Sequence, residues 1–205
     1  MSDRQSHWQN VYSTKTEDEV SWFQETPAPS LDLLALAGTG KDSAIIDIGG
    51  GTSRLVDRLL AEGYADLTVL DLSPAALETA RARLGNAGER VTWIADDATR
   101  WQPARQYDIW HDRAAFHFLT APEDQQAYVE RLRGGLRIGG HAIIGTFAVD
   151  GPEKCSGLPV SRHSAETLAA ILGPGFERLD TRRHEHATPW GSIQKFQFST
   201  FRRSA

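Results

Sequence analysis

Acidic residues follow three predicted strands, and a glycine turn follows the first of them. The apolar run 44–48 leads into Gly49-Gly50-Gly51, the run 67–71 ends in Asp71, and the run 91–95 precedes Asp96-Asp97. A strand, a glycine turn and a helix start bring a ligand close to bare backbone N–H groups. A carboxylate after the second strand can accept both hydroxyl protons of a ribose, and one after the third can accept from the amine of adenine.

The spacing of the glycines argues against two phosphate-binding motifs. A dinucleotide turn needs G-x-G-x-x-G, and Arg54 stands where the third glycine belongs. A P-loop needs Gly-Lys-Ser/Thr, which does not occur in the chain. The acid at Asp47, beside the turn, suits a cationic ligand better than a pyrophosphate. The sequence therefore favours a cationic nucleoside over a dinucleotide.

A second polar group follows the predicted fourth strand, 107–111. It contains His111, Asp112, Arg113 and His117. In an open parallel sheet, ligands bind outside the carboxyl ends of the strands. These residues either contribute to a site or form an ion-pair network that only shapes the loop, and we favour a site role for at least one of them.

The remaining elements predict an α/β fold that would hold these residues together. Four strand-then-helix repeats indicate right-handed crossovers and a Rossmann-like, doubly wound, seven-stranded sheet that is mostly parallel. The segments 176–186 and 192–201 alternate in polarity and predict a C-terminal antiparallel hairpin. The length of 205 residues predicts one domain, 1–205. The Gly- and Pro-rich loop 148–162 is expected to overhang the site.

Local signals predict where individual helices begin. We expect one helix to start at Thr52 or Ser53, another to be capped by Ser30, and a third to open with a capping box at Thr120 and Glu123. Residues 1–30 carry aromatics at helical spacing and either pack on the outside of the domain or form a lid over the ligand.

These ordered motifs resemble the class I S-adenosylmethionine (SAM)-dependent methyltransferases, of the small bacterial type 11/12-like kind. The resemblance covers most of the chain. Trp8-x-x-x-Tyr12 and the later Trp22-Phe23 are similar to the start of a group of small methyltransferases, some of which modify protein lysines. The resemblance implies SAM as the cofactor and S-adenosylhomocysteine (SAH) as the released product.

The resemblance also implies which residues form the site. Gly49, Gly51, Thr52 and Ser53 would line the methionine part, Asp71 would bind the ribose and Asp97-Ala98 the adenine, while Asp47 would orient the ammonium. The full set expected at the cofactor is Asp47, Gly49, Gly51, Thr52, Ser53, Asp71, Leu72, Asp97, Ala98, His111, Trp8 and Tyr12. Around the acceptor we expect Trp22, Arg113, His117, Cys155, Arg162, His163 and Trp190, with Arg113 and His117 as the catalytic candidates. Arg54 either holds a carboxylate or lies exposed on its helix.

The methyl acceptor is harder to predict than the cofactor. Methyl transfer from a sulfonium mainly requires alignment of nucleophile, methyl group and sulfur, so no fixed catalytic triad is needed. A small molecule is our first choice. Protein lysine methylation is the alternative, and a non-catalytic SAM-binding subunit is a third. An NAD oxidoreductase is disfavoured by Arg54.

Composition narrows the remaining classes. The formal charge of −5 argues against nonspecific nucleic-acid binding, and no apolar run approaches the roughly 20 residues that span a bilayer. A cytoplasmic protein without membrane or nucleic-acid partners is therefore expected. Cys155, the single cysteine, is either a small loop residue or a thiol for a soft acceptor. No metal is expected, because His184 and His186 lack a third ligand.

Overall fold

The computed structural model describes residues 3–205, which form a seven-stranded sheet with the strand order β3-β2-β1-β4-β5-β9-β8. The parallel strands are β1 (Ala44–Ile48), β2 (Asp66–Asp71), β3 (Val91–Ala95), β4 (Tyr107–Arg113) and β5 (Leu136–Phe147). β9 (Ile193–Arg203) runs antiparallel to β5, and β8 (Phe176–Ala187) antiparallel to β9. The predicted fold class and its C-terminal hairpin are confirmed.

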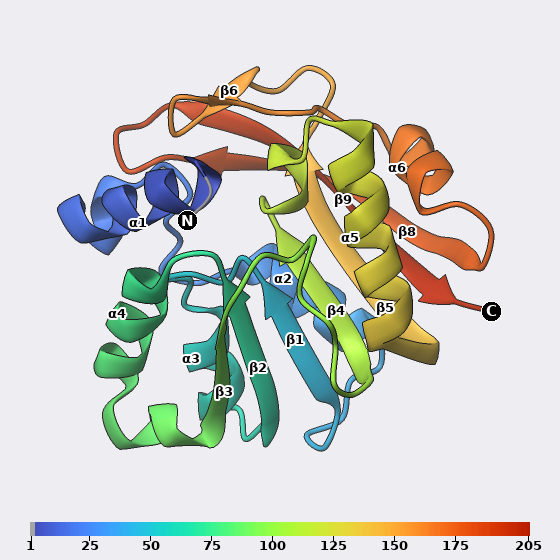
Figure 1. The fold of residues 1–205 in the computed structure, drawn as a ribbon, viewed down its shortest axis with the longest axis horizontal. Coiled ribbons are helices and arrows are strands. Elements are labelled where there is room, and N and C mark those ends of the chain that lie inside the picture. The colour runs from blue at the N-terminus through green and yellow to red at the C-terminus, as the bar shows by residue number, and fades with distance from the viewer. Residues whose placement is uncertain (1–2) are drawn as a thin grey trace.

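Helices cover both faces of the sheet (Figure 1). α5 (Pro122–Gly135) and α6 (Ala165–Leu172) lie in front of it, and α2 (Ala28–Leu36) and α3 (Leu55–Ala61) lie behind it. α4 (Pro74–Leu84) leads through the 3-10 turn η2 (Gly85–Arg90) into β3. All five residues of β1 are buried, as expected for a strand with helices on both sides.

The N-terminal segment packs over the end of the sheet to which the parallel strands point (Figure 1). It consists of α1 (Asp3–Thr14) and the 3-10 turn η1 (Glu17–Glu19). Trp8, Val11 and Val20 are buried there in a small cluster of their own. The same end carries η3 (Phe116–Phe118) and a two-stranded hairpin, β6 (Lys154–Cys155) and β7 (Leu158–Pro159), within the predicted loop 148–162.

Two predicted helix starts are wrong: α3 begins later than predicted, and α2 begins earlier. α3 begins at Leu55, since Ser53 N–H bonds Gly50 O at 2.8 Å in a turn and the Ser53 hydroxyl accepts from Leu55 N–H. α2 begins at Ala28, within a stretch where proline suits the first helical turn. Ser30 consequently lies inside the helix and does not cap it.

The start of α5 also differs from the prediction. The N-cap of α5 is Ala121 without a side-chain cap, so the capping box between Thr120 and Glu123 does not form. β5 begins at Leu136, directly after α5, and its pairing with β4 is irregular between Tyr107 and Ile109. Gly139 and Gly140 lie within this strand.

Candidate functional site

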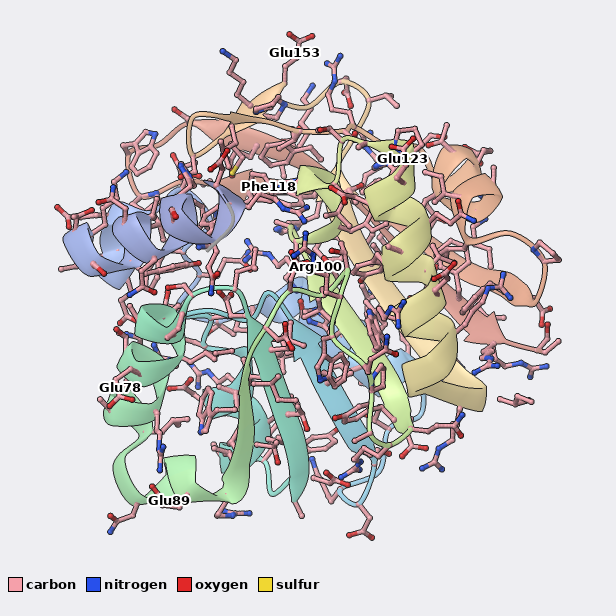
Figure 2. All side chains as sticks on the ribbon, in the orientation of Figure 1. Glu78, Glu89, Arg100, Phe118, Glu123 and Glu153 are labelled. Atoms are coloured by element: carbon pink, nitrogen blue, oxygen red, sulfur yellow. The ribbon has the colours of Figure 1, made fainter. Side chains whose placement is uncertain are left out.

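A cavity lies at the carboxyl ends of the parallel strands, beneath the N-terminal segment. Its empty volume is about 770 Å³, including the mouth that is open to solvent. Ten of the residues predicted for cofactor or acceptor line it: Trp8, Tyr12, Trp22, Gly49, Asp71, Leu72, Asp97, Ala98, Arg113 and Cys155. Phe118 closes the cavity from η3 and packs edge-on against Trp8, with ring centroids 4.9 Å apart (Figure 2).

A smaller cavity of about 280 Å³ adjoins the glycine turn and is lined by Thr52, Ser53 and Arg54, among others. Trp22 and Arg113 line both cavities. Thr52 and Ser53, predicted at the methionine part of the cofactor, therefore line the smaller, neighbouring cavity and not the main one.

The glycine turn has a shape that only glycine accommodates at two positions. Gly49 has φ +65° and Gly51 has φ +48°, which is the left-handed region. A Cβ on Gly51 would lie 2.8 Å from the Tyr12 hydroxyl oxygen and 3.1 Å from Asp71 Oδ2, and a Cβ on Gly49 would lie 2.5 Å from that of Ala115. The bare backbone of the turn thus lies directly against residues that line the cavity.

Asp71 ends β2 and is buried beside this turn. Burial and the nearby charge of Asp47 raise its pKa to about 7, although N–H groups of Ser73 and Gly51 act in the opposite direction. The Ser73 amide donates to Asp71 Oδ1 at 2.8 Å. Near neutral pH this carboxyl group therefore exists in both its acid and its ionised form, and a ligand that donates hydrogen bonds to it would favour ionisation.

Asp97 lines the cavity and forms an ion pair with Arg4. Its Oδ2 lies 3.1 Å from Arg4 Nη2, and its Oδ1 accepts from the amide and hydroxyl of Thr99. Arg4 also contacts Asp124 at 3.2 Å. Asp96 lines the same cavity, so two acids are available after β3. Arg4 is a site residue that the sequence analysis missed, because nothing local to residue 4 predicts its position.

Asp47 and His111 are held together below the cavity and do not line it. They are register partners on β1 and β4, and His111 Nδ1 lies 2.7 Å from Asp47 Oδ1. His111 Nε2 lies 2.8 Å from Ser30 Oγ. The three resemble a Ser-His-Asp triad in their order of contacts, but Ser30 is 0% exposed, so its hydroxyl has no access to a substrate. Within this unit, Asp47 lies close to the glycine turn, since a Cβ on Gly50 would be 2.8 Å from Asp47 Oδ2.

Asp112 shapes the loop after β4. Its carboxylate accepts from the amides of Ala115 and Phe116 and, at 2.7 Å, from the Tyr128 hydroxyl. Burial raises the pKa of Asp112 to about 6. In the same loop Ala114 has φ +68°, and its amide donates to Gly145 O at 2.8 Å. For Asp112 the loop-shaping interpretation is the one that the contacts favour, and Tyr128, which lines the cavity, was missed.

Arg113 and Cys155 lie at the other side of the cavity. Arg113 Nη1 donates to Trp22 O at 3.0 Å, and burial lowers the pKa of this guanidinium to about 10. Burial raises the pKa of the Cys155 thiol to about 11, and its Sγ lies 4.0 Å from Ser21 Oγ. The thiol is therefore protonated at neutral pH, which disfavours a soft-acceptor thiolate.

Four other predicted residues lie outside the lining of both cavities. His117 is fully buried, its Nδ1 accepts from the Phe147 amide at 3.3 Å, and burial lowers its pKa to about 3, so it is neutral. His163 is buried, and Arg162 pairs with Glu153, whose side chain points away from the body of the molecule (Figure 2). Trp190 is 60% exposed in the turn between β8 and β9. Arg54, by contrast, lines the smaller cavity and pairs with Glu17, a carboxylate of the chain itself.

Residues 45–140 match the family described as a methyltransferase domain, and this segment holds β1 to β4, the glycine turn and Asp71. This segment of the chain is a methyltransferase domain. N-methyltransferase NodS from Bradyrhizobium japonicum, solved in complex with SAH, has the same fold as this methyltransferase domain. Its TM-score is 0.73 at 18% identity, covering 96% of this chain and 98% of that one.

Two curated relatives of the methyltransferase domain are similar in sequence. Trans-aconitate 2-methyltransferase from Methylobacterium radiotolerans is 33% identical over 169 residues, 82% of this chain and 56% of that protein. Malonyl-acyl-carrier-protein O-methyltransferase 1 from Ilyobacter polytropus is 28% identical over 134 residues, 65% of this chain and 48% of that protein. The chain spans about half the length of these curated relatives.

The described part of the chain lacks two kinds of feature. Within residues 3–205, no helix has the length and apolar character needed to cross a membrane. The same residues contain no group of three or more His, Cys, Asp or Glu side chains that could hold a metal ion.

Proposed function

We propose that this protein binds SAM in the main cavity and transfers its methyl group to a small molecule, releasing SAH. The observation that supports this most strongly is the convergence of the glycine turn, Asp71 and Asp97 on one cavity. Each follows a different strand, and adjacent strands bring them to one edge in the order β3, β2, β1. SAM, when bound, supplies a methyl group on a positively charged sulfur.

The residues of the cavity fit the parts of SAM in that order. Asp71 would accept hydrogen bonds from the ribose hydroxyls, and Asp97 or Asp96 would accept from the adenine amine. Asp97 already binds Arg4, so it would share its carboxylate between that cation and the ligand. Gly49 and Gly51 would let the amino-acid part approach the backbone, because no side chain intervenes.

The N-terminal segment is well placed to act as a lid. Trp8, Tyr12 and Trp22 cover the cavity. Glu17 joins this segment to the domain by pairing with Arg54 and, at 2.8 Å, with Arg83. A lid that opens to admit SAM and closes before transfer would exclude water from the acceptor atom and align it with the methyl group.

A small acceptor suits the cavity better than a protein does. Aromatic side chains from the N-terminal segment and Phe118 line the cavity. A relative that aligns with 82% of this chain acts, by its name, on trans-aconitate. Protein lysine methylation and SAM binding without catalysis are the competing outcomes of the test below. We also propose that residues 1–205 act as one domain in the cytoplasm, without nucleic-acid partners, since the chain is acidic.

The test uses SAM labelled on its methyl group and an extract separated into macromolecules and small molecules. Enzyme-dependent label in the small-molecule fraction is the expected result. Label in a protein band would replace the small-molecule proposal with lysine methylation. Binding of SAM with no label in either fraction would favour a non-catalytic subunit. Heat-treated protein and the Gly51→Val variant are the blanks.

A further inference from the structure

Arg113 presents unpaired positive charge to the cavity. It is the last residue of β4, and its Nη1 donates to Trp22 O. Its Nε and Nη2 are buried and have no hydrogen-bond partner among residues 3–205. The guanidinium carbon lies 5.5 Å from the centroid of the Phe196 ring, so an aromatic face covers part of the group without accepting its hydrogens in the plane.

This arrangement is costly for the protein alone. A pKa of about 10 leaves Arg113 charged at neutral pH, and a buried charge without a partner is strongly disfavoured. Arg4, the other arginine at the cavity, has two carboxylates within ion-pair distance, those of Asp97 and Asp124. For Arg113 the stabilising acid is Asp47, which acts through space while its own Oδ1 bonds His111.

The neighbours of Arg113 within the cavity do not supply an anion. The Cys155 thiol is protonated, since burial raises its pKa to about 11, and Trp22 offers its backbone carbonyl to a single donor. Two donors of the guanidinium fork are left for a ligand. A planar fork of this kind matches the two oxygens of a carboxylate.

We infer that Arg113 is the receptor for a carboxylate, or a similar anionic group, on the molecule that occupies the β4 side of the cavity. The inference rests on the proposed function. Along the edge of the sheet the order is Asp97 after β3, Asp71 after β2, the glycine turn after β1 and Arg113 on β4. The acidic side would receive the nucleoside, and the single unpaired cation lies at the opposite side.

Two molecules could bring this carboxylate. SAM carries one on its amino-acid part, which the glycine turn would place next to β4. The acceptor could carry one instead, and Arg113 would then select acidic substrates. The chemistry at Arg113 is the same in both cases, and the two sources are separated by experiment.

The first arm compares SAM with decarboxylated SAM, which lacks only the carboxylate, by calorimetry on the unaltered protein and on Arg113→Met. If the cofactor supplies the group, the unaltered protein binds SAM about 10- to 100-fold more tightly than the decarboxylated form, and the variant binds both alike. Arg113→Lys keeps the charge but not the fork, so it should restore only part of the difference.

The second arm titrates ¹³C-labelled acetate, with acetamide as its neutral counterpart, into the protein with and without saturating SAH. If the acceptor supplies the group, acetate binds the SAH complex, acetamide does not, and Arg113→Met weakens acetate binding at least tenfold while leaving the affinity for SAM unchanged. A carboxylate preference that depends on Arg113 in either arm supports the inference. Its absence in both arms overturns it.

Two controls separate this role from a structural one. Arg100→Met removes an exposed arginine outside both cavities (Figure 2) and should leave both arms unchanged. Arg113→Met should keep or raise the melting temperature of the ligand-free protein, because it removes an unpaired buried charge, whereas a structural arginine would lower it. Failure of the unaltered protein to bind SAM would contradict the proposed function, and the acetate titration without SAH would still test Arg113.

Discussion

The two sides of the cavity differ in how their residues are positioned. On the side of β1 to β3, the glycine turn and the acids lie at or just after the ends of their strands. Asp71 and Asp97 each accept a hydrogen bond from the amide two residues further on, Ser73 N–H and Thr99 N–H. On the β4 side, Arg113, Trp22 and Cys155 come from segments more than forty residues apart, 91 residues in the case of the Arg113 bond to Trp22 O. The first side is a property of a strand-end motif, and the second depends on the whole fold. We therefore expect the first to set cofactor affinity and the second to set acceptor choice.

The largest expected effect is from Gly51→Val. A side chain at this position would collide with Asp71 and Tyr12, so SAM affinity should fall more than 100-fold by calorimetry. Gly38→Val is the matched control, because Gly38 also has positive φ but open space around it. Both variants should lose about 1–2 kcal/mol of stability from the left-handed backbone, while Gly38→Val keeps its SAM affinity. Undiminished SAM binding by Gly51→Val would contradict the proposal that the backbone of the glycine turn contacts SAM.

The next effect concerns Asp71 and pH. If its ionised form binds the ribose, SAM affinity should rise about tenfold per pH unit below pH 7 and level off above it. Because the folded-state pKa is raised from 3.8 to about 7, the contribution of this group to the stability of the ligand-free protein is fully present below pH 4. That contribution is lost as the pH rises through 7.

Asp71→Asn should flatten the pH dependence of binding, and Asp71→Ala should weaken SAM about 100-fold. The measurement is calorimetric titration of SAM at pH 5.5, 6.5, 7.5 and 8.5. An affinity that is independent of pH in the unaltered protein, or unchanged in Asp71→Ala, would contradict the ribose assignment.

A smaller effect should follow from loosening the N-terminal segment. Glu17→Gln removes the charge that pairs with Arg54 and Arg83. We expect SAM to dissociate about 3- to 10-fold faster in stopped-flow measurements, with a stability loss of at most about 1 kcal/mol because the ion pairs are partly exposed. Glu89→Gln removes the exposed partner of Arg81 at the far end of the molecule (Figure 2) and serves as the control. Equal dissociation rates in the two variants would argue against a lid.

The smallest effect is expected from Cys155→Ser. Since the thiol is protonated and buried, neither SAM affinity nor methyl transfer should change by more than about twofold. Transfer of labelled methyl groups in extract measures this directly. A large loss of transfer with intact SAM binding would show that the β4 side uses the sulfur in catalysis.

The same difference between the two sides explains what the sequence could predict. β1 and β3 were predicted to the residue, and β2 and Asp71 nearly so, because apolar runs and the acids after them are local signals. Arg4 and Tyr128 reach the cavity only through the packing of α1 and α5, which no local pattern specifies. His111 was expected at the cofactor, but its two ring nitrogens are taken by Asp47 and by Ser30 from a different helix.

The predictions of where α5 and α2 begin were wrong for a related reason. A capping box needs the right backbone turn as well as the right residues, and the chain at Ala121 leads into α5 one residue later than Thr120 would allow. Ser30 had the residue type of a cap, but α2 begins earlier and turns its hydroxyl toward His111. Tertiary contacts decide between such local alternatives.

The cavity over the glycine turn is proposed to be a SAM site and not a dinucleotide site. Calorimetric titration of SAM and NAD into the unaltered protein tests it most directly. We expect SAM to bind at one site per chain, and we expect NAD to produce no heat of binding and not to compete. Binding of NAD with no binding of SAM would contradict this proposal.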